Sequence, residues 1–190
     1  MWLILIVLLA GAPPEKIQPP AVTTLLFENS DFESGTLKNW TTTGDAFSRQ
    51  PTMGENPYHR GRGKYANIQG EYWIGSYEKF TGKPGEKPGT IQGDQPTGTL
   101  QSVPFVIGGD LIAFLIGGGQ IPGQEYVALE VDGEEVRWAT GRYDETMELI
   151  FWYVREWKGQ TARIVVKDLV AIPESWGHIN VDFFHYLNFD

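Results

Sequence analysis

The second half of the chain is a succession of strand-length segments, in which apolar residues alternate with polar ones or run together, separated by glycine-rich turns. Such segments, rich in β-branched and aromatic side chains, are typical of β-strands. In the segment 126–131, alternation places Val127, Leu129 and Val131 on one face, which we expect to lie in the core. The predicted strands are Thr99–Ile107, Leu111–Ile116, Tyr126–Val131, Glu135–Thr140, Met147–Val154, Thr161–Lys167 and Ile179–Tyr186.

Turn signals support this pattern. Asp132-Gly133 lies between two predicted strands and predicts a hairpin turn with positive φ angles, and Gly108-Gly109-Asp110 predicts a second turn of this kind. Before residue 98 the pattern is weaker, but it predicts strands at Leu25–Phe27 and Tyr72–Tyr77 and a buried Trp40.

The composition agrees with an all-β protein. Aromatic residues make up 13% of the chain and there are 23 glycines, a mixture that suits strands joined by turns. Residues 79–98 are rich in proline and glycine, which predicts a long loop that is either functional or disordered. We therefore expect one two-sheet antiparallel β-sandwich (jelly roll) over residues 24–190.

An apolar segment, residues 1–12, and a proline-rich linker, residues 13–23, precede this domain. The segment ends in Ala10-Gly11-Ala12, which is typical of a signal-peptidase site and indicates export, whereas Pro13 directly after it disfavours cleavage. As a helix it would reach about 16 Å, against a hydrocarbon core of about 30 Å, so it cannot span a bilayer alone. A cleaved leader and a retained membrane-associated anchor both remain open. The anchor would consist of Trp2, Leu3, Ile4, Leu5, Ile6, Val7, Leu8 and Leu9.

Charge and cysteine content exclude several classes of function. A formal net charge of −9 and a pI of about 4.8 argue against a nucleic-acid-binding surface. The absence of cysteine excludes thiolate nucleophiles, disulfides and Cys-ligated metals. The basic cluster at residues 59–64 is interpreted as a solvated loop, with a phosphate or anionic-lipid contact as the alternative.

Several short motifs occur in order along residues 31–182. They are Asp31-Phe32-Glu33-Ser34-Gly35, Trp40, Gly98-Thr99-Leu100, Gly117-Gly118-Gly119, Val131-Asp132-Gly133, Ala139-Thr140-Gly141 and Trp176-Gly177-His178-Ile179-Asn180. Their order and spacing resemble the β-sandwich carbohydrate-binding modules attached to bacterial levanases and fructan hydrolases of the invertase type. The resemblance implies a non-catalytic jelly roll that binds the terminal fructose of fructans. The chain departs from that family at Gln120, where a histidine is expected, and at Tyr153, where an aspartate is expected.

The chemistry of sugar recognition selects candidate residues independently. Vicinal hydroxyls need convergent polar side chains, and the apolar face of a sugar ring needs an aromatic surface. His178 has an alternative role as a hydrogen-bonded structural residue, and Asp168 and Asp182 could instead hold turns or coordinate a structural Ca²⁺; no other cofactor is expected. The candidate carbohydrate-binding residues are Arg142, Glu145, Asp168, Trp176, His178, Gly118 and Gln120.

Catalysis has little support in the sequence. The three histidines form no H-E-x-x-H pair, and Gly75-Ser76 lacks the spacing of a nucleophile elbow. We therefore expect no enzyme activity. One hypothesis is an exported accessory subunit, docked through residues 1–20 on a membrane-embedded assembly and in contact with the membrane surface, at the periplasmic or extracellular face of a bacterial membrane. The alternative is a secreted or periplasmic lectin-like module that binds fructan or a related glycan.

Overall fold

A computed structural model of the chain describes residues 24–61, 63–171 and 176–187. Its regular elements are β-strands and two short 3₁₀ helices, η1 (Asn56–Arg60) and η2 (Arg155–Trp157). No helix in these ranges is long and apolar enough to cross a membrane. The predicted anchor at residues 1–12 and the predicted linker at residues 13–23 lie outside the described residues.

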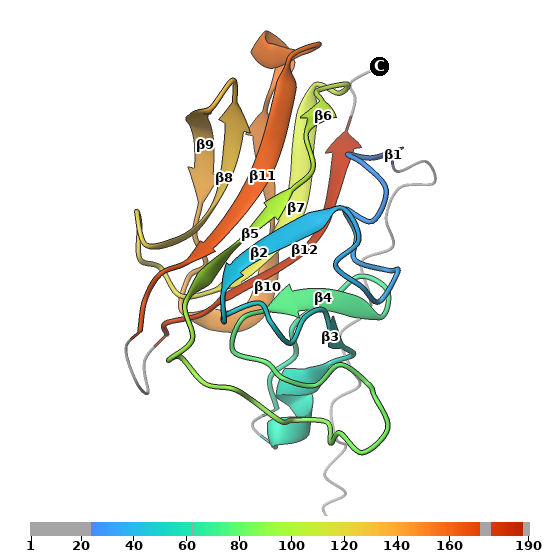
Figure 1. Cartoon of the computed structure of the whole chain (residues 1–190), viewed down its shortest axis with the longest axis vertical. Helices are drawn as coiled ribbons and strands as arrows, with labels where there is room; N and C mark the ends of the chain where they lie inside the picture. Colours follow the sequence, from blue (N-terminus) through green and yellow to red (C-terminus); the bar gives the residue numbers. More distant parts are fainter. Residues whose placement is uncertain (1–23, 62, 172–175, 188–190) are drawn as a thin grey trace, which may run out of the picture.

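The strands form two antiparallel sheets packed against each other (Figure 1). The first sheet has the order β10-β7-β12-β4-β3, with β1 paired to β12, and the second has the order β2-β5-β11-β8-β9, with β6 paired to β11. The predicted two-sheet antiparallel β-sandwich is confirmed. The first sheet contains β1 (Thr24–Leu25), β3 (Thr52–Met53), β4 (Tyr72–Gly75), β7 (Leu111–Gly118), β10 (Asp144–Tyr153) and β12 (Ile179–Leu187); the second contains β2 (Trp40–Gly44), β5 (Gly98–Ser102), β6 (Phe105–Val106), β8 (Glu125–Val131), β9 (Glu134–Ala139) and β11 (Thr161–Asp168).

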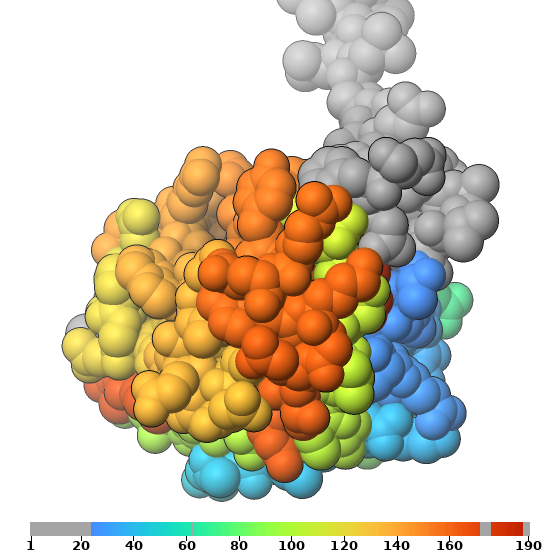
Figure 2. Space-filling model, turned by 90° about the horizontal axis from the view of Figure 1, so that it is seen from above, coloured from blue at the N-terminus to red at the C-terminus, as the bar shows by residue number. Residues whose placement is uncertain are grey.

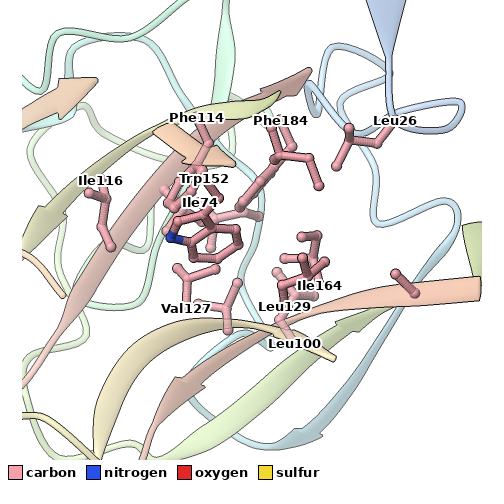
Figure 3. Packing of buried hydrophobic residues seen from close by; sticks show 14 of the residues in the cluster. Leu26, Ile74, Leu100, Phe114, Ile116, Val127, Leu129, Trp152, Ile164 and Phe184 are labelled. Atoms are coloured by element: carbon pink, nitrogen blue, oxygen red, sulfur yellow. The ribbon is translucent and has the colours of Figure 1, made fainter. Parts of the chain in front are cut away.

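The core fills the space between the two sheets (Figure 3). Val127, Leu129 and Val131 lie in it, as the alternation along β8 predicted. Phe114 of β7 is fully buried, with its ring centroid 4.6 Å from that of Trp152 and 4.9 Å from that of Phe184. These aromatic contacts join three neighbouring strands of the first sheet, and they add to the apolar burial that stabilises the sandwich.

Most predicted strands are present with boundaries shifted by a few residues. The predicted strand Thr99–Ile107 is in fact two strands, β5 and β6, because Pro104 between them has no backbone N–H to donate to a sheet. The strand β2, which ends at Gly44, was missed because all its residues after Trp40 are exposed and it lacks apolar alternation. Trp40 itself is buried, as expected.

The two predicted positive-φ turns have different outcomes. Asp132 (φ 50°) and Gly133 (φ 85°) form the predicted hairpin between β8 and β9. The prediction for Gly108-Gly109-Asp110 was wrong, because none of these residues has a positive φ. This segment joins β6 of the second sheet to β7 of the first, so it is a crossover between sheets rather than a hairpin.

The long loop between β4 and β5 is present and is tied to the body of the domain. The side-chain amide of Gln92 donates to the carbonyl of Ala46 (2.7 Å), and that of Asn56 donates to the carbonyl of Thr90 (3.1 Å). This loop lies at the lower end of the sandwich in Figure 1. In the view from above (Figure 2), the first strands and the β8–β9 hairpin lie on opposite sides of the molecule.

Candidate functional site

A group of buried and half-buried polar side chains gathers at one end of the sandwich. At this end β4, β7 and β11 finish, while β8, β10 and β12 begin, so side chains distant in sequence meet there. We call this group the polar cluster. It consists of Arg60, Glu78, Asp94, Glu145, His178 and Asn180.

His178 lies between two carboxylates in the polar cluster. Its Nδ1 is 2.8 Å from Oδ1 of Asp94, and its Nε2 is 3.7 Å from Oε2 of Glu145. Burial alone would lower the pKa of His178, but the hydrogen bond to Asp94 and the charge of Glu145 raise that pKa to about 9. The imidazole is therefore positively charged at neutral pH, and it donates from Nδ1 to Asp94.

Arg60 joins two further carboxylates. One of its terminal nitrogens is 2.5 Å from Oε1 of Glu78, and the other is 2.5 Å from Oε1 of Glu145. Burial raises the pKa of Glu78 although Arg60 acts in the opposite direction. Burial also acts to raise the pKa of Glu145, but His178 and Arg60 outweigh it and the pKa is lowered, so this carboxyl is ionised. The side chain of Asn180 donates to Oε2 of Glu145 (3.2 Å).

Two aromatic rings, those of Tyr77 and Trp176, flank this charged group. The ring centroid of Tyr77 is 4.9 Å from that of His178, and that of Trp176 is 5.4 Å from it. The guanidinium carbon of Arg60 lies 5.3 Å from the centre of the Tyr77 ring. Both rings are partly exposed, whereas His178 is buried. Rigid polar groups beside partly exposed rings are a combination that can bind a polyhydroxylated ligand such as a sugar.

The structure brings together three of the predicted site residues: Glu145, Trp176 and His178. Gly118 is close to them through its backbone only. Its φ is +88°, and a Cβ at this position would lie 2.3 Å from the carbonyl oxygen of His178, so the glycine permits the close approach of the end of β7 to the start of β12, where Gly118 pairs with Ile179. Asp168 is buried at the end of β11, beside Glu125 rather than among the groups joined by Arg60.

Two predicted residues lie away from the polar cluster. Arg142 has a 67% exposed side chain and forms an ion pair with Glu148 (3.0 Å). Gln120 is exposed, and its carbonyl accepts a hydrogen bond from the hydroxyl of Tyr143 (3.0 Å). The structure therefore does not bring these two residues together with His178 and Glu145.

Arg60 is the main residue that sequence reasoning placed wrongly. It belongs to the basic cluster at residues 59–64 that was interpreted as a solvated loop, yet its side chain is only 14% exposed. Lys64 fits the original interpretation, because its side chain is 52% exposed and pairs with Asp144 on the surface. Glu78 and Asp94 carried no motif, and the only available signal was their position beside or within a long loop.

Comparisons with known proteins place the fold but not the ligand. No family model matches the chain. Over 159 residues the chain is 32% identical to ecdE of Aspergillus rugulosus, a protein named as a glycosyl hydrolase; the match covers 83% of the chain and 20% of ecdE. Among solved structures, the carbohydrate-binding module TmCBM61 in complex with β-1,4-galactotriose superposes with a TM-score of 0.52 and 16% identity, covering 87% of the chain and 99% of that module.

This chain has the fold of that module. The K1 cleaved adhesin domain of Lys-gingipain from Porphyromonas gingivalis also matches, with a TM-score of 0.43, 14% identity, and coverage of 84% of the chain and 96% of that domain. The chain thus spans about a fifth of the length of ecdE and nearly the whole of the two solved domains.

Proposed function

We propose that this domain is a non-catalytic carbohydrate-binding module and that the polar cluster, with Tyr77 and Trp176, is its sugar-binding site. The observation that carries the proposal is the fixed placement of Arg60, Glu145 and His178 beside these two rings. Ion pairs hold the three polar side chains before any ligand binds, so little conformational entropy is lost on binding. The rings supply the apolar surface that a sugar face needs.

The ion pairs also support a binding role over a catalytic one. A glycosidase needs two carboxyl groups facing the substrate, one to act as acid and one as base or nucleophile. In the polar cluster, Glu78 and Glu145 both contact Arg60, and Asp94 is bonded to His178. Identity to one part of a longer protein named as a glycosyl hydrolase agrees with an accessory domain of a carbohydrate-active protein.

The ligand we propose is a fructan, bound through its terminal sugar, because the sequence motifs resemble those of modules attached to fructan hydrolases. The test is isothermal titration calorimetry of the full chain with levan oligosaccharides, inulin and β-1,4-galactotriose. We expect Trp176→Ala to weaken binding of the preferred glycan by more than about tenfold, as loss of a central aromatic contact does.

The matched control is Trp138→Ala, because Trp138 is 59% exposed on β9, the edge strand of the second sheet, and is not part of the polar cluster. Arg142→Ala is a second control. Both should bind like the wild-type protein. Absence of glycan binding by the wild type, or equal losses in Trp138→Ala and Trp176→Ala, would contradict the proposed site.

Export and attachment to a membrane assembly through residues 1–20 stay predictions from the sequence. They are tested by sequencing the N-terminus of the mature protein and by extracting membranes with high salt and then with detergent. A mature protein that begins after Ala12 and is soluble without partners would contradict the anchor.

A further inference from the structure

Two buried carboxyl groups beside the polar cluster lack the partners that burial demands. Glu125 begins β8 and Asp168 ends β11, and the two are directly paired across these strands. Their residues are 0% and 1% exposed. Within the described part of the chain, both carboxylate oxygens of Glu125 and Oδ1 of Asp168 have no hydrogen-bond partner. Unpartnered buried carboxylates are costly, so these three oxygens need an explanation.

The surrounding backbone adds another oxygen to this place. At Gly119, a Cβ would lie 2.0 Å from the carbonyl oxygen of Trp176 and 2.4 Å from Oε1 of Glu125. Both oxygens therefore border the space that any larger side chain at this position would fill. Carbonyl oxygens and the oxygens of ionised carboxylates are all hydrogen-bond acceptors and none is a donor. The two carboxylates and the carbonyl oxygen repel one another unless a positive charge or a proton lies between them.

We propose that Glu125, Asp168 and the carbonyl of Trp176 bind one Ca²⁺ ion. A hard cation that takes carboxylates and backbone carbonyls suits this donor set, and its two charges balance the two carboxylates. Softer metals are disfavoured because His178 already donates to Asp94 and the chain has no cysteine. Among the described residues no three His, Cys, Asp or Glu side chains are grouped to hold a metal, so the remaining ligands have to be backbone carbonyls and water.

The competing explanation is a proton in place of the ion. Burial, with the nearby charge of Asp168, raises the pKa of Glu125 to about 8, and burial raises that of Asp168 to about 6. A protonated Glu125 that donates a hydrogen bond to Asp168 would satisfy one of its own oxygens and Oδ1 of Asp168, but it would leave its second oxygen without a partner. The two explanations differ in whether Ca²⁺ binds at all.

The test is calcium binding to the full chain after treatment with a chelator, measured by calorimetry and by elemental analysis after dialysis. We expect Glu125→Gln and Asp168→Asn each to hold one Ca²⁺ fewer than the wild type. Thermal unfolding gives a second measurement, because an ion that binds only the folded state raises the melting temperature. Added CaCl₂ should raise it in the wild type, and the rise should be smaller or absent in both variants.

The matched control is Asp132→Asn, which removes an exposed carboxylate at the far end of β8 in a turn conformation that asparagine tolerates. It should keep the wild-type stoichiometry. If the wild type binds no Ca²⁺, or if both variants bind as much as the wild type, the proposal is overturned. The wild-type measurement needs no variant, so poor folding of Glu125→Gln would not prevent a decision, and no step depends on glycan binding.

Discussion

At the scale of single residues, the protonation of His178 links the polar cluster to stability. The folded-state pKa of about 9 lies above the ordinary value of 6.5, because Asp94 and Glu145 outweigh the effect of burial. The folded state therefore holds a proton that the unfolded state releases between these pH values. This contribution to stability is complete below about pH 6.5 and is lost as the pH rises through about 9.

We accordingly expect the free energy of unfolding to fall as the pH rises from 6.5 to 9, measured by urea denaturation in the presence of a chelator. Glu125, whose pKa is raised to about 8, acts in the same direction up to about pH 8, whereas Asp168, whose pKa is raised to about 6, acts mainly below this range. The variant His178→Gln isolates the contribution of His178. In this variant the free energy of unfolding should decrease less between pH 6.5 and 9 than it does in the wild type. His59→Gln, at an exposed position, is the control; an unchanged pH dependence in His178→Gln would contradict the assignment.

At the scale of elements, the pairing of the end of β7 with the start of β12 depends on a glycine. Gly118→Ala should destabilise the protein by about 2 to 4 kcal/mol, since it combines an unfavourable positive φ with a clash against the carbonyl of His178. Gly133→Ala is the matched control: its φ is +85°, but nothing lies within 4 Å of the added Cβ, so it should cost only about 1 kcal/mol. Urea denaturation measures both, and equal losses would show that φ alone matters at Gly118.

The strands also explain which parts of the fold and of the site could be predicted from the sequence. Apolar alternation identified β8 and its core face because every second residue, Val127, Leu129 and Val131, packs into the core between the sheets. The chemistry of sugar recognition, rather than alternation, placed Arg142 in the site with Glu145, and the pairing of β10 with β7 shifts register between Asp144 and Glu148. Such an irregularity changes the direction of side chains without leaving a pattern in the sequence. Glu145 lies within this irregular stretch and reaches the polar cluster, whereas Arg142 precedes β10 and is exposed.

The other residues of the site could not be predicted from the sequence, for a different reason. Arg60 lies in a 3₁₀ helix, and Asp94 lies in the long loop before β5. Neither segment has a periodic pattern, and their meeting with Glu145 and His178 is a property of the folded chain. Local sequence predicts which residues form strands, whereas the partners of a buried charge depend on loops that cross from distant positions.

At the scale of the whole molecule, both sheets contribute to one core, so the described domain should unfold in a single cooperative transition. A substitution at Phe114 tests this most directly, because Phe114 is fully buried and its ring contacts those of Trp152 and Phe184. Phe114→Ala should lower the free energy of unfolding by about 3 to 5 kcal/mol through lost burial and the cavity that remains. Val106→Ala, at a position 61% exposed, is the control and should change it by less than about 0.5 kcal/mol.

Because the core is shared, the loss in Phe114→Ala should be the same whether unfolding is followed by far-ultraviolet circular dichroism, which reports the strands, or by tryptophan fluorescence, which reports Trp152 and the other indoles. Two members of the polar cluster, Glu145 and Asn180, lie on β10 and β12, the strands that flank β7 and Phe114 in the first sheet, so glycan binding, where present, should disappear in this same transition and not before it. If the two spectroscopic signals changed at different urea concentrations, the sheets would be stabilised separately. If glycan binding were lost at a lower urea concentration than either signal, the end carrying the polar cluster would open independently of the core.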